Sequence, residues 1–186
     1  MNEELTVTPP GAKLIEDFIN TNELDEPDGE HLRGASDLSV WLSERDLLPA
    51  GARLSGDDLD SAIAVREALR KLLLANNGAP LDPSAVTTLN EAADRSRLRV
   101  AFSPAGQADL VPDEPDVPGA LSRILAVAYT SMADESWTRL KACRLDDCQW
   151  AFYDQSKNRS RTWCSMKVCG NRAKARAYRE RQRSEA

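Results

Sequence analysis

The chain has 186 residues, of which 41 % are hydrophobic, so it can bury one large or two small cores and is not intrinsically disordered. Taken over the whole chain, its formal net charge of −6 argues against a polyanionic partner. No run of about 18 apolar residues occurs, and the acidic start Met1–Leu5 lacks the features of a secretory signal. We therefore expect a cytoplasmic protein that does not enter a membrane.

The first half of the chain predicts four helices, because apolar residues recur at spacings of three and four. In chain order, the predicted inward faces are Leu14, Ile15, Phe18 and Ile19; Leu38, Trp41 and Leu42; Leu59, Ile63, Leu69, Leu72 and Leu73; and Val86, Leu89 and Ala93. The helix-start signals are Ser36, Ser55 with Asp58 in a capping-box pattern, and Asp82 before Pro83, while Asn76-Asn77-Gly78 is a stop signal.

The second half begins with a predicted β-hairpin. Leu98, Val100 and Phe102 alternate with other residues, a Pro- and Gly-containing turn follows, and 107–111 could form the return strand. From Gly119 an apolar helix is expected to run past Met132 to Leu140. The predicted fold class is α+β and mostly α, with a helical domain at 1–138 and a compact module at 139–186.

All four cysteines lie in that module, as two pairs with four residues inside each pair: Cys143 and Cys148, then Cys164 and Cys169. Clustered cysteines in a reducing compartment favour a metal, and four thiolates favour structural Zn²⁺ in tetrahedral geometry. A module of about 45 residues rarely folds on its apolar core alone, and a bound metal supplies the missing stability. Two disulfides, buried thiols or an iron–sulfur cluster are the alternatives.

The module also carries the positive charge. Residues 139–186 hold 13 Lys and Arg against 5 Asp and Glu, a net charge of +8, which leaves −14 for residues 1–138. After the first cysteine pair we expect a short strand at Trp150–Asp154, a turn at Gln155–Ser160 and a basic helix over 170–183. Screening at physiological salt confines the influence of the acidic half to about 8–10 Å, so the module can still bind a polyanion.

The candidate nucleic-acid contacts are arginines and lysines of this helix and turn. One helical stripe contains Arg172, Arg176, Arg179 and Arg183, a second contains Lys174 and Arg181, and the turn contributes Lys157, Arg159 and Arg161. Arginine suits bidentate contacts with phosphate or guanine, so we expect the helix to enter the major groove while the turn contacts phosphates. Asn171 is expected to hydrogen-bond a thiolate or to cap the loop, and Arg172 could act likewise.

Three other interpretations stay open for these residues. The basic segment could be a solvated tail, or it could bind an acidic partner protein. RNA is a further alternative, because Trp150, Phe152, Tyr153 and Trp163 could stack on unpaired bases. An enzyme is not expected: His31 is the sole histidine, and no phosphate-binding glycine loop or hydrolase motif occurs.

The C-terminal residues resemble a known family, the CGNR zinc finger, through Cys143-x4-Cys148, Trp163-Cys164-Ser165-Met166 and Cys169-Gly170-Asn171-Arg172. Upstream, Asp17-Phe18-Ile19-Asn20-Thr21 and Trp41-Leu42 resemble the ABATE domain that precedes this finger, although Glu16 stands where that family has an apolar residue. The resemblance implies a bacterial, stress-induced transcriptional regulator with Zn²⁺ on the four cysteines and a DNA-binding finger. The resemblance also implies a small-molecule effector site near Asp17, Phe18 and Asn20. From the charges of −14 and +8, the N-terminal domain could instead bind the finger and suppress its DNA binding, and homodimerisation is a third role for this domain.

Overall fold

The computed structural model describes residues 8–184 as a helical body with a small C-terminal unit attached. The α-helices are α1 (Pro10–Ile19), α2 (Ala35–Ser43), α3 (Gly56–Asn76), α4 (Pro83–Ala93), α5 (Val117–Ala133) and α6 (Asn171–Ser184). The strands are β1 (Leu98–Phe102), β2 (Ala108–Pro112), β3 (Leu140–Ala142) and β4 (Ala151–Tyr153). A 3-10 turn, η1 (Trp137–Arg139), precedes β3, and a π-helical turn, η2 (Met166–Gly170), precedes α6. The mostly helical α+β class is confirmed.

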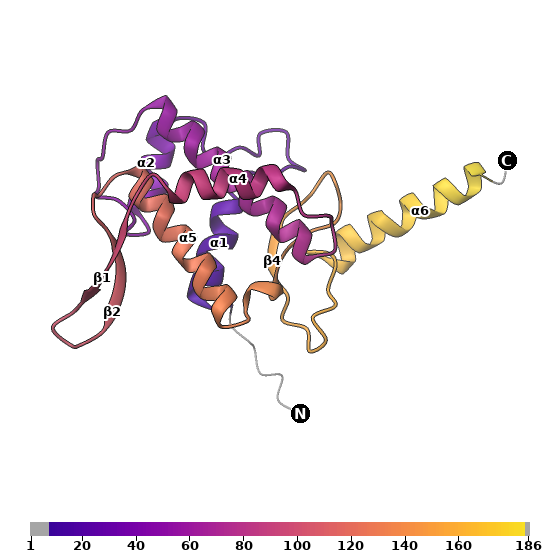
Figure 1. Ribbon diagram of the computed structural model, residues 1–186. Helices are drawn as coiled ribbons and strands as arrows, with labels where there is room; N and C mark the ends of the chain where they lie inside the picture. The colour runs from indigo at the N-terminus through magenta and orange to yellow at the C-terminus, as the bar shows by residue number, and fades with distance from the viewer. Residues whose placement is uncertain (1–7, 185–186) are drawn as a thin grey trace.

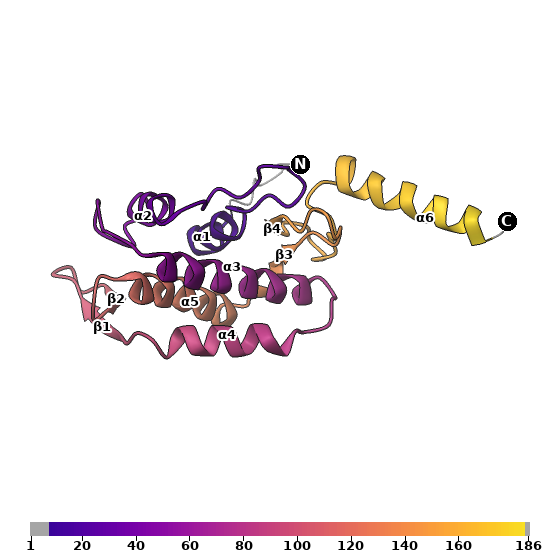
Figure 2. The same cartoon turned by 90° about the horizontal axis from the view of Figure 1, so that it is seen from above.

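The helices of the body form layers. Helices α3 and α5 lie in the middle, with α1 and α2 on one side and α4 on the other (Figure 2). The β1–β2 hairpin projects from one end of the body, and α6 extends from the other end (Figure 1). Within residues 8–184, no helix combines the length and apolar character needed to cross a membrane.

The two small sheets are both antiparallel hairpins. Strand β1 pairs with β2, so that Val100 lies opposite Leu110, and β3 pairs with β4, so that Lys141 lies opposite Phe152. The predicted hairpin is confirmed. The alternation in β1 does not correspond to a buried face, however, since Leu98 is half-buried and Val100 and Phe102 are 59 % and 74 % exposed.

The buried core continues from the body into the second hairpin. Phe18 and Trp41 pack with their ring centroids 5.2 Å apart, among the buried leucines and isoleucines of α1, α2, α3 and α5. Leu140, Ala142 and Ala151 belong to the same cluster. The hairpin that carries the first cysteine pair is therefore packed against the body, and burial of this apolar surface stabilises the contact.

Side-chain amides extend this contact with hydrogen bonds. Asn76 donates to the carbonyls of Trp137 and Leu140 at 2.9 Å, and Asn77 donates to Ala142 and Thr162 at 2.8 Å. Asn20 exchanges two hydrogen bonds with the backbone of Ala151, at 2.8 and 3.0 Å. The asparagines that end α3 thus serve as more than a stop signal, because they satisfy carbonyl groups next to the cysteines.

Two predicted helix boundaries need correction. Gly34, not Ser36, occupies the N-cap of α2, and no side chain caps that helix. Helix α5 ends at Ala133, and Glu135 adopts a positive φ of 63°, so the helix does not continue to Leu140. The helix breaks here, and Leu140 instead belongs to strand β3, where it pairs with Tyr153.

The predicted inward face of α4 is also wrong in part. Val86 and Ala93 are exposed and Leu89 is half-buried, whereas Ala85 and Ala92 are buried. Helix α4 contacts α3 and α5 through these small side chains, spaced two turns apart. The capping box of α3 is confirmed, with Ser55 and Asp58 bonding each other's backbone N–H groups.

Glu16 of α1 provides a pH-dependent test of the contact between the body and the second hairpin. Burial raises the pKa of this half-buried carboxyl to about 7, so its contribution to stability is complete below the unfolded pKa and is lost as pH rises toward 7. We expect Glu16→Gln to gain about 1 kcal/mol relative to the native chain between pH 4 and pH 8, after allowance for solvent screening. Urea unfolding at both pH values measures this, and an equal difference at the two values would contradict it.

Candidate functional site

The four cysteine sulfurs converge at one point beside the second hairpin. Their Sγ atoms all lie within 4.8 Å of one another. The Sγ–Sγ distances are 3.6 Å for Cys148–Cys164, 3.4 Å for Cys164–Cys169 and 3.7 Å for Cys148–Cys169. Zn–S bonds of about 2.3 Å place tetrahedral sulfurs about 3.8 Å apart, so the four thiols fit Zn²⁺. The separations are too long for S–S bonds of about 2.05 Å, and the cysteines are free, which removes the disulfide alternative.

The electrostatics of the cluster explain why a cation is needed. A hydrogen bond with Cys148 lowers the pKa of Cys143 to about 2, and the same contact raises the pKa of Cys148 to about 12. Hydrogen bonding to Cys143 also raises the pKa of Cys164. One thiolate therefore forms easily but opposes a second beside it, and a divalent ion at the centre stabilises all four.

Two tight turns aim the sulfurs inward. The turn of the β3–β4 hairpin contains the first pair, closed by hydrogen bonds from Cys143 N to the Trp150 carbonyl and from Cys148 N to the Leu145 carbonyl, both 3.0 Å. Gln149 adopts a positive φ of 48° there. In the second pair, Cys164 precedes η2 and Cys169 lies within it, and the Ser165 hydroxyl accepts from Val168 N at 3.3 Å. Trp150, Trp163 and Ala173 pack around the cluster and shield it.

Comparison with known families identifies both parts of the chain. Residues 139–182 match the CGNR zinc finger. Residues 12–135, two thirds of the chain, match the ABATE family, described as "Putative stress-induced transcription regulator". The chain belongs to the ABATE family. No curated protein matched it. The two matches confirm the resemblance found in the sequence: one family is a regulator family and the other a zinc-finger family. The zinc-finger match and the four converging cysteines together confirm that the site fits zinc.

Each residue of the CGNR tetrapeptide has a structural use. Cys169 faces the cluster, and a Cβ on Gly170 would lie 2.4 Å from Met166 Sδ and 3.2 Å from Trp163 Cδ1, so the backbone passes close to both side chains. Asn171 donates to the Lys167 carbonyl at 2.9 Å, a contact within the turn that carries Cys169. Arg172 donates to Asp147 at 2.6 Å and so joins α6 to the first cysteine turn.

An ion pair that the sequence did not reveal shapes the loop after β4. Asp154 is 0 % exposed and accepts from Lys141 Nζ at 2.7 Å, from Arg161 N at 2.9 Å and from Ser156. Burial alone would raise the pKa of Asp154, but the hydrogen bonds from Lys141 and Ser156 outweigh it and lower the pKa. A lysine in a strand and an aspartate after one are ordinary in sequence, so only the fold identifies the pair.

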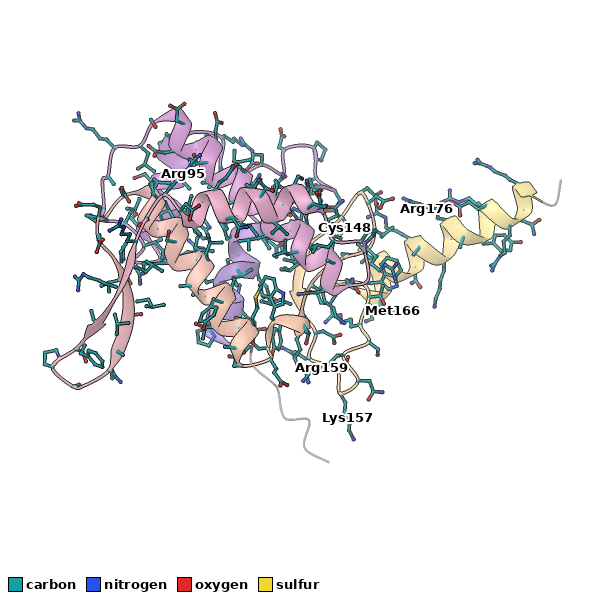
Figure 3. The ribbon with its side chains drawn as sticks, in the orientation of Figure 1. Arg95, Cys148, Lys157, Arg159, Met166 and Arg176 are labelled. Atoms are coloured by element: carbon teal, nitrogen blue, oxygen red, sulfur yellow. The ribbon has the colours of Figure 1, made fainter. Side chains whose placement is uncertain are left out.

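The basic residues expected on the predicted turn do not adjoin the basic helix. The 155–161 loop follows β4 rather than closing the hairpin, and Lys157 and Arg159 lie well apart from Arg176 in Figure 3. Arg161 is exposed but folds back onto the protein: its guanidinium donates to the carbonyls of Trp163 and Cys164 and lies 5.0 Å from the Phe152 ring centroid. Arg161 therefore braces the backbone next to a cysteine.

The basic residues of α6 fall into two groups. Arg172 and Arg176, at its base, pair with aspartates of the protein itself. Arg179 and Arg183 continue the same stripe beyond the body, while Lys174, two residues and about 200° from Arg172, lies on the opposite face of the helix. The part of α6 that stands clear of the body thus presents positive charge on more than one side: Lys174, Arg179, Arg181 and Arg183 are exposed.

Proposed function

We propose that the protein is a DNA-binding transcriptional regulator in which the CGNR finger presents α6 to the DNA. The observation that supports this best is the exposure of α6. From Lys174 to Arg183 every residue is exposed, and the helix extends from the body (Figure 1). Its 14 residues correspond to about 21 Å, long enough to follow a major groove about 12 Å wide.

The composition of α6 explains why a polyanion is the expected partner. The helix has no apolar face for the body to bury, and short polar helices of this kind are marginal in water. Anchoring the first turn at the metal centre gives the helix a nucleus, and phosphate would neutralise the arginines further along. Arginine also reads guanine through two parallel hydrogen bonds, which gives a route to sequence preference.

Three aromatic side chains of the finger, Phe152, Trp150 and Trp163, are engaged in packing and are poorly placed to stack on unpaired RNA. Phe152 is buried, and Trp150 and Trp163 pack against the cysteine cluster. Stacking on bases requires exposed rings, so these side chains would have to leave their packing sites. Binding to an acidic protein stays the competing proposal, and competition with heparin separates the two.

We assign the regulatory part to the ABATE domain. Phe18 lies in its core and Asn20 contacts the finger, so these positions, first considered for an effector, serve packing. A cavity of about 410 Å³ lies elsewhere, between α3, α4 and the start of α5, with an apolar floor that includes Val65 and Leu121. That volume suits a small molecule, and homodimerisation is the second proposed route of regulation.

Salt dependence tests the proposed contacts. If six cations bind phosphates, the logarithm of affinity should fall against the logarithm of salt concentration with a slope of about −5. Arg179→Gln with Arg183→Gln should make that slope shallower by about 2 units, because two phosphate contacts are lost. Fluorescence anisotropy on genomic fragments between about 50 mM and about 200 mM salt measures this slope.

The control is Arg53→Gln, which removes one exposed positive charge from the loop between α2 and α3. It should leave the slope unchanged. A slope near zero for the native chain, or the same slope for the α6 variant as for the control, would contradict the phosphate contacts. Uniform loss of all fragments to heparin would favour generic polyanion binding over regulation.

A further inference from the structure

A closed acidic loop lies in the connection between α1 and α2. Asn22 and Glu30 form an isolated antiparallel bridge, and Glu23 N donates to the Gly29 carbonyl at 2.9 Å, which brings the two ends of the loop together. A Cβ on Gly29 would lie 1.9 Å from the Glu23 carbonyl oxygen, so this crossing requires glycine. We call residues 22–30 the acidic loop; it contains Asp25, Glu26 and Asp28 at or near its tip.

Two buried arginines of α3 hold the acidic loop in place. Arg66, 1 % exposed, donates to both carboxylate oxygens of Glu30 at 2.8 and 2.6 Å. Arg70 donates to the carbonyls of Ile19 and Asn22 at 2.7 and 3.1 Å, and its other amino group donates to the Gln149 carbonyl at 3.0 Å. One buried side chain thus ties the base of the acidic loop to the first cysteine turn, so the two are fixed relative to each other.

The tip of the acidic loop reaches the base of α6. An oxygen of Asp25 lies 3.7 Å from Nη1 of Arg172, whose Nη2 lies 2.6 Å from Asp147. Arg176 lies 3.5 Å from Asp147 and 4.0 Å from Asp146. Carboxylates from the ABATE domain and from the first cysteine turn therefore occupy the sites that phosphates would take on the first turn and a half of the basic helix.

We infer that the acidic loop is an intramolecular competitor for nucleic acid, which acts by holding Arg172 through Asp25. The inference rests on the proposed function, because competition needs a polyanion that binds α6. Asp25 and Arg172 are partly exposed, so their pair is screened and readily exchanged. This suits a contact that phosphate displaces on binding. Any change in the ABATE domain that moves the loop, through its buried attachment at Arg66 and Arg70, would then alter the affinity of the finger.

Neutralising Asp25 is the direct test. Asp25→Asn should tighten binding of the full-length, zinc-loaded protein to a DNA duplex by about two- to fivefold at 100 mM salt, the range expected for release of one exposed ion pair. Asp28→Asn is the matched control: it makes the same charge change in the same loop, and Asp28 is not among the described residues that pair with α6. It should change the affinity by less than about 1.5-fold.

Equal effects of Asp25→Asn and Asp28→Asn would overturn the inference, since only the overall charge would then matter. Weaker binding by Asp25→Asn would also overturn it, because Asp25 would then orient Arg172 for DNA. Hydrogen exchange of the amides in the first turns of α6 tests the contact without DNA. Asp25→Asn should speed this exchange, and unchanged exchange would contradict the contact.

The two measurements keep this inference separate from the proposed function. Faster exchange in Asp25→Asn with no binding of DNA by any variant would mean that the contact exists but that the proposed function is wrong. DNA binding by all variants with identical affinities would keep the proposed function and remove the competitor.

Discussion

Removing zinc is expected to disorder the finger while leaving most of the body folded. With a chelator, or in Cys148→Ser, the two cysteine turns lose the ion that draws them together, and α6 loses its anchored first turn. Structural zinc contributes an apparent 10–16 kcal/mol in finger peptides, more than the packing of a small module can replace. Helices α1 to α5 should persist, because their core is built from their own leucines, isoleucines and aromatic residues.

Far-UV circular dichroism with metal analysis measures this. We expect a partial loss of helical signal, about the share contributed by α6, and a loss of DNA affinity of at least about a hundredfold at moderate salt. Ser165→Ala is a suitable control, since it removes a hydrogen bond to Val168 N in the same turn but no thiol. An unchanged spectrum in the metal-free protein would contradict the anchoring role of the metal.

The buried pair of Lys141 and Asp154 should produce the second large effect. In Lys141→Met, Asp154 keeps its charge at 0 % exposure without its cationic partner, and breaking such a pair by removing one side costs about 3–5 kcal/mol. Lys141 also donates to the carbonyls of Arg159 and Arg161, so the 155–161 loop should loosen as well. Urea unfolding of the zinc-loaded protein gives the change in free energy.

Two further variants separate charge from packing. Lys141→Met combined with Asp154→Leu should recover part of the lost stability, because no unpaired charge remains buried. Lys157→Met changes an exposed lysine of the neighbouring loop and should alter stability by less than about 0.5 kcal/mol. Equal costs for Lys141→Met and Lys157→Met would show that the buried pair is not a source of stability.

The features that sequence predicted well are those set by neighbouring residues. The capping box at Ser55, the stop at Asn76–Gly78 and the β1–β2 hairpin depend on contacts within a few positions. The cysteine spacing likewise predicted the cluster, because closely spaced cysteines in a reducing compartment bind a metal more often than they form disulfides. These local signals were enough for the fold class and for the metal.

The features that sequence missed depend on distant partners. Arg66 and Arg70 look like surface charges of a helix, and only the fold buries them against Glu30 and the Gln149 carbonyl. The sequence predicts that α5 runs to Leu140, because apolar residues continue at helical spacing past its true end. In the fold, Leu140 pairs with Tyr153 and therefore belongs to a strand. Tertiary pairing overrides local periodicity at such positions.

The division of the chain at residues 138 and 139 stays a proposal about domains. Family matches end at 135 and begin again at 139, which agrees with it in sequence. In space, Leu140, Ala142 and Ala151 share the core of the ABATE domain, and asparagine side chains cross the boundary. We therefore propose that the finger depends on the body for its position and does not move as an independent unit.

The most direct measurement is selection of genomic DNA fragments by the full-length protein, with heparin as competitor. The selection is carried out with the zinc-loaded and the zinc-free protein, and the zinc content of each sample is measured. We expect one zinc ion per chain, enrichment of a common sequence by the loaded protein, and loss of that enrichment when the metal is removed. Enrichment that survives without the metal, or a loaded protein that selects no sequence, would contradict a zinc-held basic helix as the reader of DNA.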